Sequence, residues 1–487
     1  MKEIKTLGEL KKTGYRSRSI KEELRENLIK KLHNREPIFE GIIGYEHTVI
    51  PDVERAVLSG HNINFLGLRG QAKTKMARQL TNLLDEWMPV IQGSELNDDP
   101  LNPVSSYGKK MVEEMQDNTP VAWIHRSERY SEKLATPDVT VADLIGDIDP
   151  IKAANLRISY ADERAIHYGI IPRSNRCIFV INELPDLQPR IQVALFNLLQ
   201  EGDMQIRGYK MRMPLDILFV FTANPEDYTS RGTIITPLKD RIGSQILTHY
   251  PQSIALSKQI TQQEAKLNKQ QQQIEVSPII ADLVEQIAVE ARSSEFVDQK
   301  SGVSARLAIS AYQTVVSAAE RRMLLNRESN GFVRISDLYA AIPAINGKIE
   351  LVYEGETEGP AKVAMSLISK AIRNYFVSFF PDPSKLKKKK EESPYNQLIE
   401  WFSDKSLDIL FNDTNRDYFL KLDAVEPIEP LLKYYKKKTS LQESYILKEL
   451  ILHGLAEHSQ IGKSVITGQS IQFKDLINTV FNPNDLS

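Results

Sequence analysis

Short apolar runs separated by helical patterns fill the first half of the chain. The runs at residues 63–67, 176–181 and 216–222 are rich in Ile, Val and Phe and have polar flanks. Continuous apolar runs of this length are typical of strands buried on both faces of a parallel sheet. A helical pattern at residues 74–90 follows the first run, and a further strand is expected at 121–124. Strands that alternate with helices predict an α/β fold with a parallel sheet.

The second half of the chain has a different periodicity. Residues 278–345 carry apolar side chains at helical spacing and predict an all-helical unit. Before it, residues 252–276 are very polar and predict a solvated helix or linker. Residues 383–394 have the lysine-rich composition of an exposed linker, and helical patterns resume after it, as at 441–455.

Composition limits the functional classes. The chain has 487 residues, 41% hydrophobic and 26% charged, which is ordinary for a globular protein of several domains. Its formal net charge of −2 gives no general case for binding nucleic acid. The single cysteine, Cys177, excludes a disulfide framework and a cysteine-rich zinc site. The amino terminus lacks the apolar core of a secretory signal, and no apolar run is long enough to cross a bilayer, so we expect a cytoplasmic protein without membrane contact.

The amino-terminal segment stands apart from this globular pattern. Residues 1–36 contain eleven Lys or Arg against six Asp or Glu and have a helical pattern. We interpret them as a solvated N-terminal helical arm, with a basic contact surface as the alternative.

A candidate phosphate loop follows the first apolar run. Residues 67–74 read GLRGQAKT and match the phosphate-loop pattern except at Ala72, where glycine is usual. Backbone N–H groups of such a loop bind phosphates, Lys73 reaches the β- and γ-phosphates, and Thr74 offers its hydroxyl to Mg²⁺. A Cβ at position 72 is costly if the loop needs a positive φ there. The candidate nucleotide-binding residues are Gly67, Arg69, Gly70, Gln71, Ala72, Lys73 and Thr74. The alternative is an ordinary turn between a strand and a helix.

A second candidate motif ends the next apolar run. Residues 177–183 read CIFVINE, so Asn182 and Glu183 stand at the carboxyl end of a strand, where open α/β sheets bind ligands. The usual pair is Asp-Glu. Asn182 can still accept a hydrogen bond from a metal-bound water but brings no charge, so Mg²⁺ affinity should fall, while Glu183 remains a candidate general base. The alternative is a buried strand with polar residues at its end.

Two further residues fit the same chemistry. The third run ends in Thr-Ala-Asn-Pro, and Asn224 could orient a water molecule opposite Glu183, although it could simply cap a turn. Arg241 follows a short helical pattern. It could be a surface charge, or it could reach the γ-phosphate bound to a neighbouring subunit as an arginine finger.

These motifs, in this order, resemble the AAA+ ATPases. The box at residues 41–60 is similar to the segment that precedes their phosphate loop, and residues 138–187 resemble the magnesium chelatase I-subunit and MoxR branch. The matching residues of that segment are Gly146, Asp147, Asp149, Gly169, Ile170, Ile171, Asn175 and Arg176. The resemblance covers about residues 37–345.

The resemblance implies a fold and a division into domains. We expect an α/β protein with an AAA+ parallel-sheet nucleotide-binding core, an all-helical lid and a helical C-terminal region. The expected segments are an N-terminal helical arm (1–36), the α/β core (37–251), the lid (252–345), a connecting segment with the lysine-rich linker (346–394) and a helical C-terminal domain (395–487).

The resemblance also implies roles for individual residues. Ile43 and Gly44 would lie by the adenine, Asn224 would be sensor 1, and Arg241 would be the arginine finger. In the lid, Arg306 would be sensor 2 and touch the γ-phosphate. Three other residues are candidates of the same origin, with Arg231 as a second trans-acting arginine and Lys210 and Arg212 on a hairpin insert at Gln205–Met213.

The function implied is a ring-forming ATPase, a hexamer by family analogy, that uses ATP and Mg²⁺. It would remodel a protein client or a partner with a von Willebrand factor A domain. Ala72 and Asn182 both depart from the family pattern at phosphate and metal positions, so hydrolysis is expected to be weakened. The alternative is a nucleotide-gated scaffold with little or no hydrolysis. A nucleic-acid or transcription-associated AAA+ protein is least favoured, because no Gly-Ala-Phe-Thr-Gly-Ala loop is present and Lys387–Lys390 fit a solvated linker.

Overall fold

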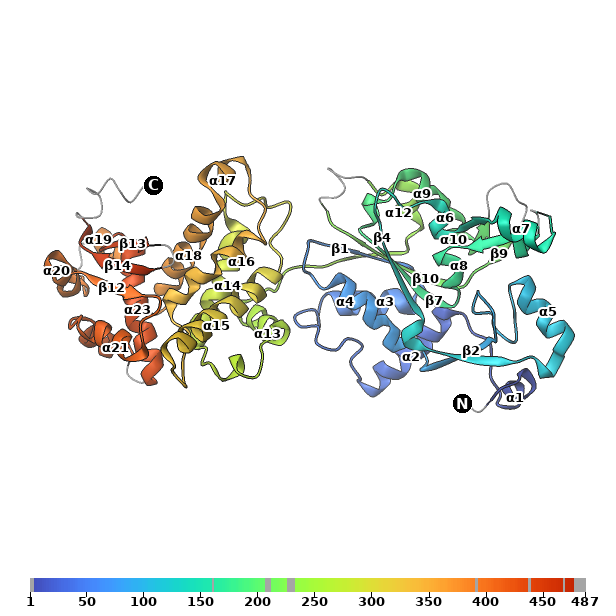
Figure 1. Ribbon diagram of the computed structural model, residues 1–487, viewed down its shortest axis with the longest axis horizontal. Coiled ribbons are helices and arrows are strands. Elements are labelled where there is room, and N and C mark those ends of the chain that lie inside the picture. Colours follow the sequence, from blue (N-terminus) through green and yellow to red (C-terminus); the bar gives the residue numbers. More distant parts are fainter. Residues whose placement is uncertain are drawn as a thin grey trace. The chain divides into compact units, whose positions relative to one another are not determined.

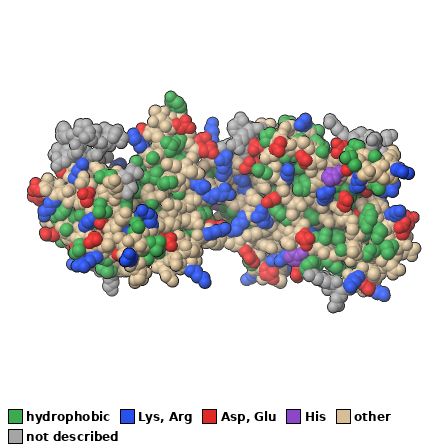
Figure 2. Space-filling model, in the orientation of Figure 1, with side chains coloured by type: hydrophobic (Ala, Val, Ile, Leu, Met, Phe, Trp, Pro, Cys, Tyr) green, Lys and Arg blue, Asp and Glu red, His purple; other side chains and the backbone are tan. Residues whose placement is uncertain are grey.

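The computed structural model describes residues 4–159, 162–205, 212–225, 233–389, 393–436, 439–466 and 469–476. The chain divides into two compact units, residues 1–249 and 250–487 (Figure 1). In the described residues, no helix is both long and apolar enough to cross a membrane. Acidic and basic side chains are found on the surface of both units in the face shown in Figure 2.

The first unit is built on a five-stranded parallel sheet in the order β11-β1-β10-β7-β4. Every residue of β10 is buried, as are the first five of β7. This sheet confirms the parallel-sheet core and the three strands predicted from the apolar runs. Its strands are β1 (Ile63–Leu66), β4 (Tyr130–Leu134), β7 (Cys177–Asn182), β10 (Ile217–Ala223) and β11 (Ser244–Leu247).

Strand order decides which motifs meet. After β1 the chain crosses to β4 at the far edge and returns through β7 and β10, which pairs directly with β1. Phe65 pairs with Thr222, and Phe221 pairs with Ile181, so the strands end at nearly the same level. The strand ends that carry the three predicted motifs are therefore neighbours at the carboxyl edge of the sheet.

Helices cover both faces of the sheet, because successive side chains of each strand point to opposite faces and both sets are apolar. Ile178 and Val180 join a core with the helices that surround the phosphate loop, whereas Phe179 and Ile181 face a second core. The first face is covered by α2 (Ile20–Asn34), α3 (Val49–Leu58), α4 (Lys73–Gln79) and the 3₁₀ helix η1 (Leu80–Leu83). The second carries α6 (Val141–Leu144), α8 (Ile170–Arg173), α9 (Pro189–Ala194), α10 (Phe196–Gln200) and α12 (Thr236–Arg241).

The segment after the phosphate loop differs from the prediction. The helix expected at 74–90 ends at Gln79, and β2 (Trp87–Ile91) occupies its last part. The strand expected at 121–124 is confirmed as β3 (Val121–His125), but it pairs with β2 in a separate antiparallel sheet. The sequence Trp-Met-Pro-Val-Ile favours a strand, and its proline removes a donor that a helix interior would need.

Smaller elements surround this core. The hairpin expected at Gln205–Met213 is confirmed by the antiparallel pair β8 and β9, although Lys210, Arg231 and the side chain of Arg212 lie outside the described residues. A second hairpin pairs β5 with β6. These elements are α1 (Leu7–Lys12), α5 (Ser106–Met115), β5 (Gly146–Ile148), α7 (Pro150–Leu156), β6 (Ile166–Tyr168), β8 (Asp203–Gln205) and β9 (Arg212–Pro214).

Helix α2 of the N-terminal arm packs one face into the core, so the interpretation of the arm as solvated was wrong. Ile20, Leu24 and Leu28 on α2 are at most 1% exposed and join the core beneath the sheet. Their i, i+4, i+8 spacing is an apolar helix stripe, which the high charge of residues 1–36 obscured.

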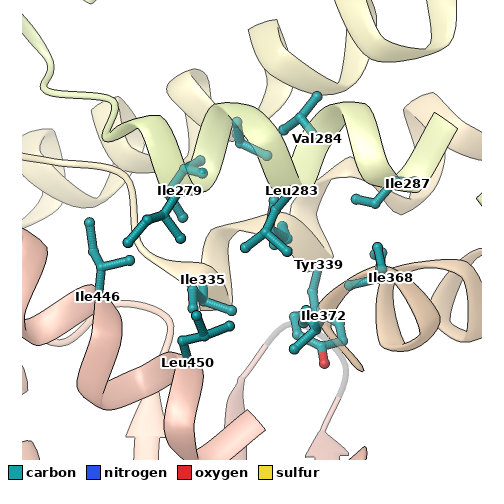
Figure 3. Close-up of a cluster of buried hydrophobic side chains, with 14 of the residues drawn as sticks. Ile279, Leu283, Val284, Ile287, Ile335, Tyr339, Ile368, Ile372, Ile446 and Leu450 are labelled. Atoms are coloured by element: carbon teal, nitrogen blue, oxygen red, sulfur yellow. The ribbon is translucent and has the colours of Figure 1, made fainter. Parts of the chain in front are cut away.

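The second unit is mainly helical and has one continuous hydrophobic cluster from Ile274 to Phe473 (Figure 3). The prediction of helices at 278–345 is confirmed. A three-stranded antiparallel sheet, β12-β14-β13, adds strands that the helical patterns do not predict. Its helices are α13 (Ile254–Glu264), α14 (Pro278–Ser293), α15 (Arg306–Asn326), α16 (Ile342–Asn346), α17 (Tyr353–Glu358), α18 (Pro360–Phe376), α19 (Pro383–Lys389), α20 (Asn396–Asp404), α21 (Asn415–Asp423), α22 (Ile428–Tyr435) and α23 (Leu441–Glu457). Its strands are β12 (Leu407–Leu410), β13 (Gly462–Ile466) and β14 (Ser470–Lys474).

Candidate nucleotide site

The loop between β1 and α4 has the backbone expected of a phosphate loop. The Gly67 amide donates to the Ala223 carbonyl at 3.1 Å, and helix α4 begins at Lys73. Ala72 has φ 56° and ψ 14°, in the left-handed region. The sequence predicts backbone strain at Ala72 if the loop needs a positive φ there, and the structure has that positive φ. A Cβ in this region costs roughly 1–2 kcal/mol.

Lys73 connects the loop to the neighbouring strand β10. Its Nζ donates to the backbone oxygens of Gly67 and Leu68, the latter at 2.9 Å, and to Asn224 Oδ1 at 2.7 Å. Asn224 itself is 7% exposed and follows directly on β10. The ammonium group thus lies between the loop and the strand end, where it could contact a phosphate bound by the loop amides.

The remaining polar groups come from β7 and α4. Thr74 Oγ1 lies 3.4 Å from Asn182 Oδ1, and Thr222 Oγ1 donates to the same oxygen at 3.1 Å. The Glu183 amide donates to Thr222 Oγ1 at 3.2 Å, and Glu183 has φ 57°. Thr222 was not singled out from the sequence, although it stands in the strand-end tetrapeptide that drew attention to Asn224. It fixes both residues of the Asn-Glu pair.

The oxygens of Thr74 and Asn182 could hold Mg²⁺ only if a bound phosphate supplies further ligands. Among the described residues there is no cluster of three His, Cys, Asp or Glu side chains that could hold a metal by itself. Thr74 and Asn182 offer neutral oxygens, the ligand type that Mg²⁺ accepts. Since Mg²⁺ keeps waters and binds substrate phosphates with few protein ligands, these two oxygens suit a shared site.

The box before the phosphate loop lies against it. Lys75 Nζ donates to the Gly41 carbonyl at 3.1 Å, and the Tyr45 hydroxyl lies 3.2 Å from the Gln71 carbonyl oxygen. Ile43 and Gly44 fall between these two contacts, and both are half-buried. The segment expected near the adenine is thus placed beside the loop.

Arg241 is not part of this cluster. Arg241 donates to Gln200 Oε1 at 3.0 Å and to the Pro237 carbonyl at 2.7 Å, and it lies over the Phe196 ring. Its guanidinium is therefore held on the α10–α12 surface. Arg306 begins α15 in the second unit, so its contact with the site remains a prediction.

Comparison with known proteins gives one curated relative. No family model matches the chain. The chain is 27% identical over 225 residues to the magnesium-chelatase 38 kDa subunit of Cereibacter sphaeroides, which covers 44% of this chain and 60% of that protein. The match therefore spans less than two thirds of the relative. It confirms the predicted resemblance to the magnesium chelatase and MoxR branch of the AAA+ ATPases.

Solved structures include distant matches. A complex of the magnesium chelatase subunits BchI and BchD is 19% identical, covers 66% of this chain and 99% of that chain, and has a TM-score of 0.35. NtrX from Brucella abortus in complex with ATP is 13% identical, covers 75% and 69%, and has a TM-score of 0.34.

Proposed function

We propose that this chain is a ring-forming AAA+ ATPase that couples ATP binding and hydrolysis to remodelling of a protein client or partner. The observation that carries the proposal is the convergence of polar groups from three adjacent strand ends. Lys73 donates to Asn224, and beside this contact Thr74 and Thr222 hold the Asn182-Glu183 pair by hydrogen bonds.

Each group has a distinct task in this proposal. The loop amides and the N-terminus of α4 bind the phosphates, and Lys73 adds a positive charge. Bound Mg²⁺ would neutralise phosphate charge, and Thr74 and Asn182 would bind it directly or accept hydrogen bonds from its water ligands. Glu183 accepts the proton of the attacking water, and Asn224 orients that water.

The proposal extends to a ring, with a hexamer as the expected size. Arg241 on the α12 surface would complete the site of a neighbouring subunit, and Arg306 would act from a lid formed by residues 252–345. Residues 346–394 would connect this lid to a C-terminal domain, and a von Willebrand factor A protein is the partner class we expect.

The first test is the ATPase activity of the purified protein with Glu183→Gln. Loss of the general base should lower turnover about 10²–10⁴-fold while the affinity for ATP stays within about twofold. Glu113→Gln is a matched control, because Glu113 is an exposed carboxylate on α5. Equal turnover in Glu183→Gln and wild type would contradict the catalytic assignment.

A second test addresses the ring. Arg241→Ala should reduce turnover about 10³-fold without weakening ATP binding, because its charge acts on the neighbouring subunit's nucleotide. Lys239→Ala removes the same charge from the same helix and should leave turnover near the wild-type value. Light scattering with and without ATP would measure assembly, and a monomer under both conditions would contradict the ring.

A nucleotide-gated scaffold is the second candidate, favoured by the neutral Asn182. It predicts tight ATP binding with no detectable turnover in the assembled wild-type protein. The same two measurements, binding affinity and turnover, therefore separate the scaffold from the enzyme.

A further inference from the structure

Tyr45 lies between the phosphate loop and the end of the first unit. It is 6% exposed, and its hydroxyl lies 2.8 Å from the His249 carbonyl oxygen and 3.2 Å from the Gln71 carbonyl oxygen. Both oxygens can only accept, whereas a phenol has a single proton to donate. The hydroxyl can therefore make one strong hydrogen bond of the two at a time.

A second contact ties the same loop residue to the same strand end. Thr248 Oγ1 donates to Gln71 Oε1 at 2.6 Å, and both side chains are buried. A Cβ on Gly67 would collide with both of these atoms, so the glycine at this position makes room for the contact. The Gln71 side chain is thus hydrogen-bonded to Thr248, and the Tyr45 hydroxyl lies between the carbonyl oxygens of Gln71 and His249.

His249 is the last residue of the first unit, and Tyr250 is the first of the second. The Tyr45 ring packs edge-on against the His249 ring with centroids 4.9 Å apart. Thr48 Oγ1 lies 2.8 Å from His249 Nε2. The connection between the units therefore leaves the first unit from a position held by Tyr45 and Thr48.

We propose that Tyr45 is a positioning residue that couples occupancy of the phosphate loop to the His249–Tyr250 connection; this rests on the proposed nucleotide binding. The peptide joining Gln71 to Ala72 carries the Gln71 carbonyl and the Ala72 amide. When this amide donates to a phosphate, the carbonyl of the same peptide becomes a stronger acceptor. Tyr45 then donates to Gln71 and releases the His249 carbonyl, so bound nucleotide loosens the connection.

Hydrogen exchange with Mg·ADP tests this coupling, because ADP binds without requiring turnover. A peptide covering residues 246–256 should exchange about fivefold faster with saturating Mg·ADP than without it, on the scale of one net hydrogen bond. Tyr45→Phe keeps the ring against His249 but has no proton to share. Its exchange should be the same with and without Mg·ADP, and its melting temperature should confirm that it is folded.

Thr48→Val is the matched control. It removes the hydroxyl beside the His249 ring and keeps the Tyr45 hydroxyl, so exchange should rise in both states while the acceleration by Mg·ADP persists. An equal acceleration in Tyr45→Phe and wild type would overturn the inference, and so would unchanged or slower exchange in wild type with bound ADP. Calorimetric binding of Mg·ADP separates the two levels. Absence of binding defeats the proposed function as well, whereas binding without a Tyr45-dependent difference defeats this inference alone.

Discussion

Both ends of the parallel sheet carry polar and charged side chains, but the charged side chains at the carboxyl end, called the open end below, are partly exposed, and the arginines at the amino end, called the closed end, are buried. At the carboxyl end, Asn182 and Glu183 are partly exposed, and Ala72 and Glu183 have left-handed backbone. At the amino end, Arg129 and Arg176 stand directly before β4 and β7, and both are buried. Arg176 also has left-handed backbone, so accessibility rather than strain separates the two ends. Buried, paired charges serve stability, whereas chemistry on a ligand requires polar groups that the ligand can reach.

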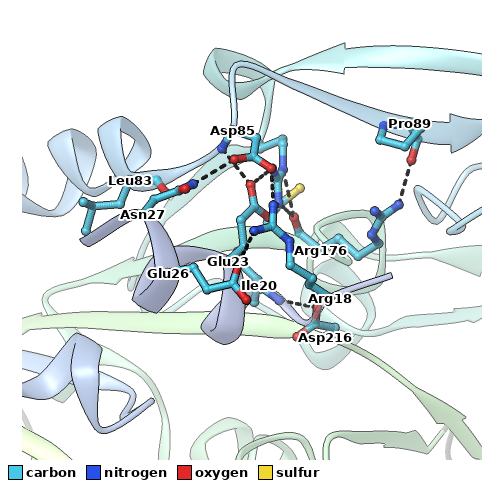
Figure 4. Close-up of polar contacts among 12 residues, drawn as sticks. Arg18, Ile20, Glu23, Glu26, Asn27, Leu83, Asp85, Pro89, Arg176 and Asp216 are labelled. Carbon is cyan, nitrogen blue, oxygen red and sulfur yellow. Dashed lines mark hydrogen bonds and ion pairs between the residues drawn. The ribbon is translucent and has the colours of Figure 1, made fainter. Parts of the chain in front are cut away.

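The amino-end cluster is held by the N-terminal arm (Figure 4). Arg129 Nη1 and Nη2 each donate to a Glu23 carboxylate oxygen at 2.7 Å, and the Asp85 amide donates to Glu23 Oε1 at 2.7 Å. The Ile20 amide donates to Asp216 Oδ2 at 2.6 Å, just before β10 begins. Helix α2 is therefore fastened to the bases of two strands.

The largest expected effect is a loss of stability when the buried ion pair between Glu23 and Arg129 at the closed end is removed. Glu23→Ala would leave the Arg129 guanidinium buried without its carboxylate, which should lower the free energy of unfolding by about 3–5 kcal/mol. The affinity for ATP should not change in the folded fraction, because the site is at the other end of the sheet. Urea unfolding measures the first and calorimetry the second.

The exposed pair of Asp52 and Arg55 provides the control. Asp52→Ala should change stability by less than about 1 kcal/mol. A similar small loss for Glu23→Ala would show that the buried pair does not hold the arm.

The next effect is a dependence of stability on pH. Burial raises the pKa of Asp216 to about 6, although the hydrogen bond from the Ile20 amide and the charge of nearby Arg176 act to lower that pKa. The folded state therefore binds more protons than the unfolded state between pH 4 and 6, and the stability from this group is lost as pH rises through that window. The loss should be roughly 3 kcal/mol. Asp216→Asn cannot titrate, so urea unfolding at pH 4, 5, 6 and 7 should show a shallower decline. Parallel profiles for the two proteins would contradict the assignment.

The two ends also differ in how far the sequence could predict them. Residues 67–74 and the Asn182-Glu183 pair were found because each motif is local, and the strand order then brought them together. Glu23 and Arg129 are 106 residues apart, and no local pattern links them. The hydroxyls of Thr222 and Tyr45 were missed for the same reason, since their roles depend on partners from other segments.

A smaller effect is expected at the open end from restoring a charge. Asn182→Asp keeps the acceptor for the Thr74 and Thr222 hydroxyls and adds the negative charge that Mg²⁺ favours. Turnover at limiting Mg²⁺ should rise about tenfold, equivalent to about 1.4 kcal/mol. Asn197→Asp adds the same charge at an exposed position on α10 and serves as the control. An unchanged Mg²⁺ dependence in Asn182→Asp would remove Asn182 from the proposed metal site.

The smallest effect concerns the strained backbone of the open end. Ala72→Gly should raise the free energy of unfolding by about 0.5–1 kcal/mol, because relief of the left-handed strain exceeds the entropy that glycine adds to the unfolded chain. Ala154→Gly on the exposed side of α7 should have the opposite sign, with a loss of about 1 kcal/mol, since that residue is helical. If Ala72 keeps its conformation when nucleotide binds, the strain is present in both states and cancels, so the affinity for Mg·ADP should stay within about twofold. A larger loss of affinity in urea-stable Ala72→Gly would show that the strained alanine preorganises the loop, which would make the open end of the sheet a site whose rigidity is part of its function.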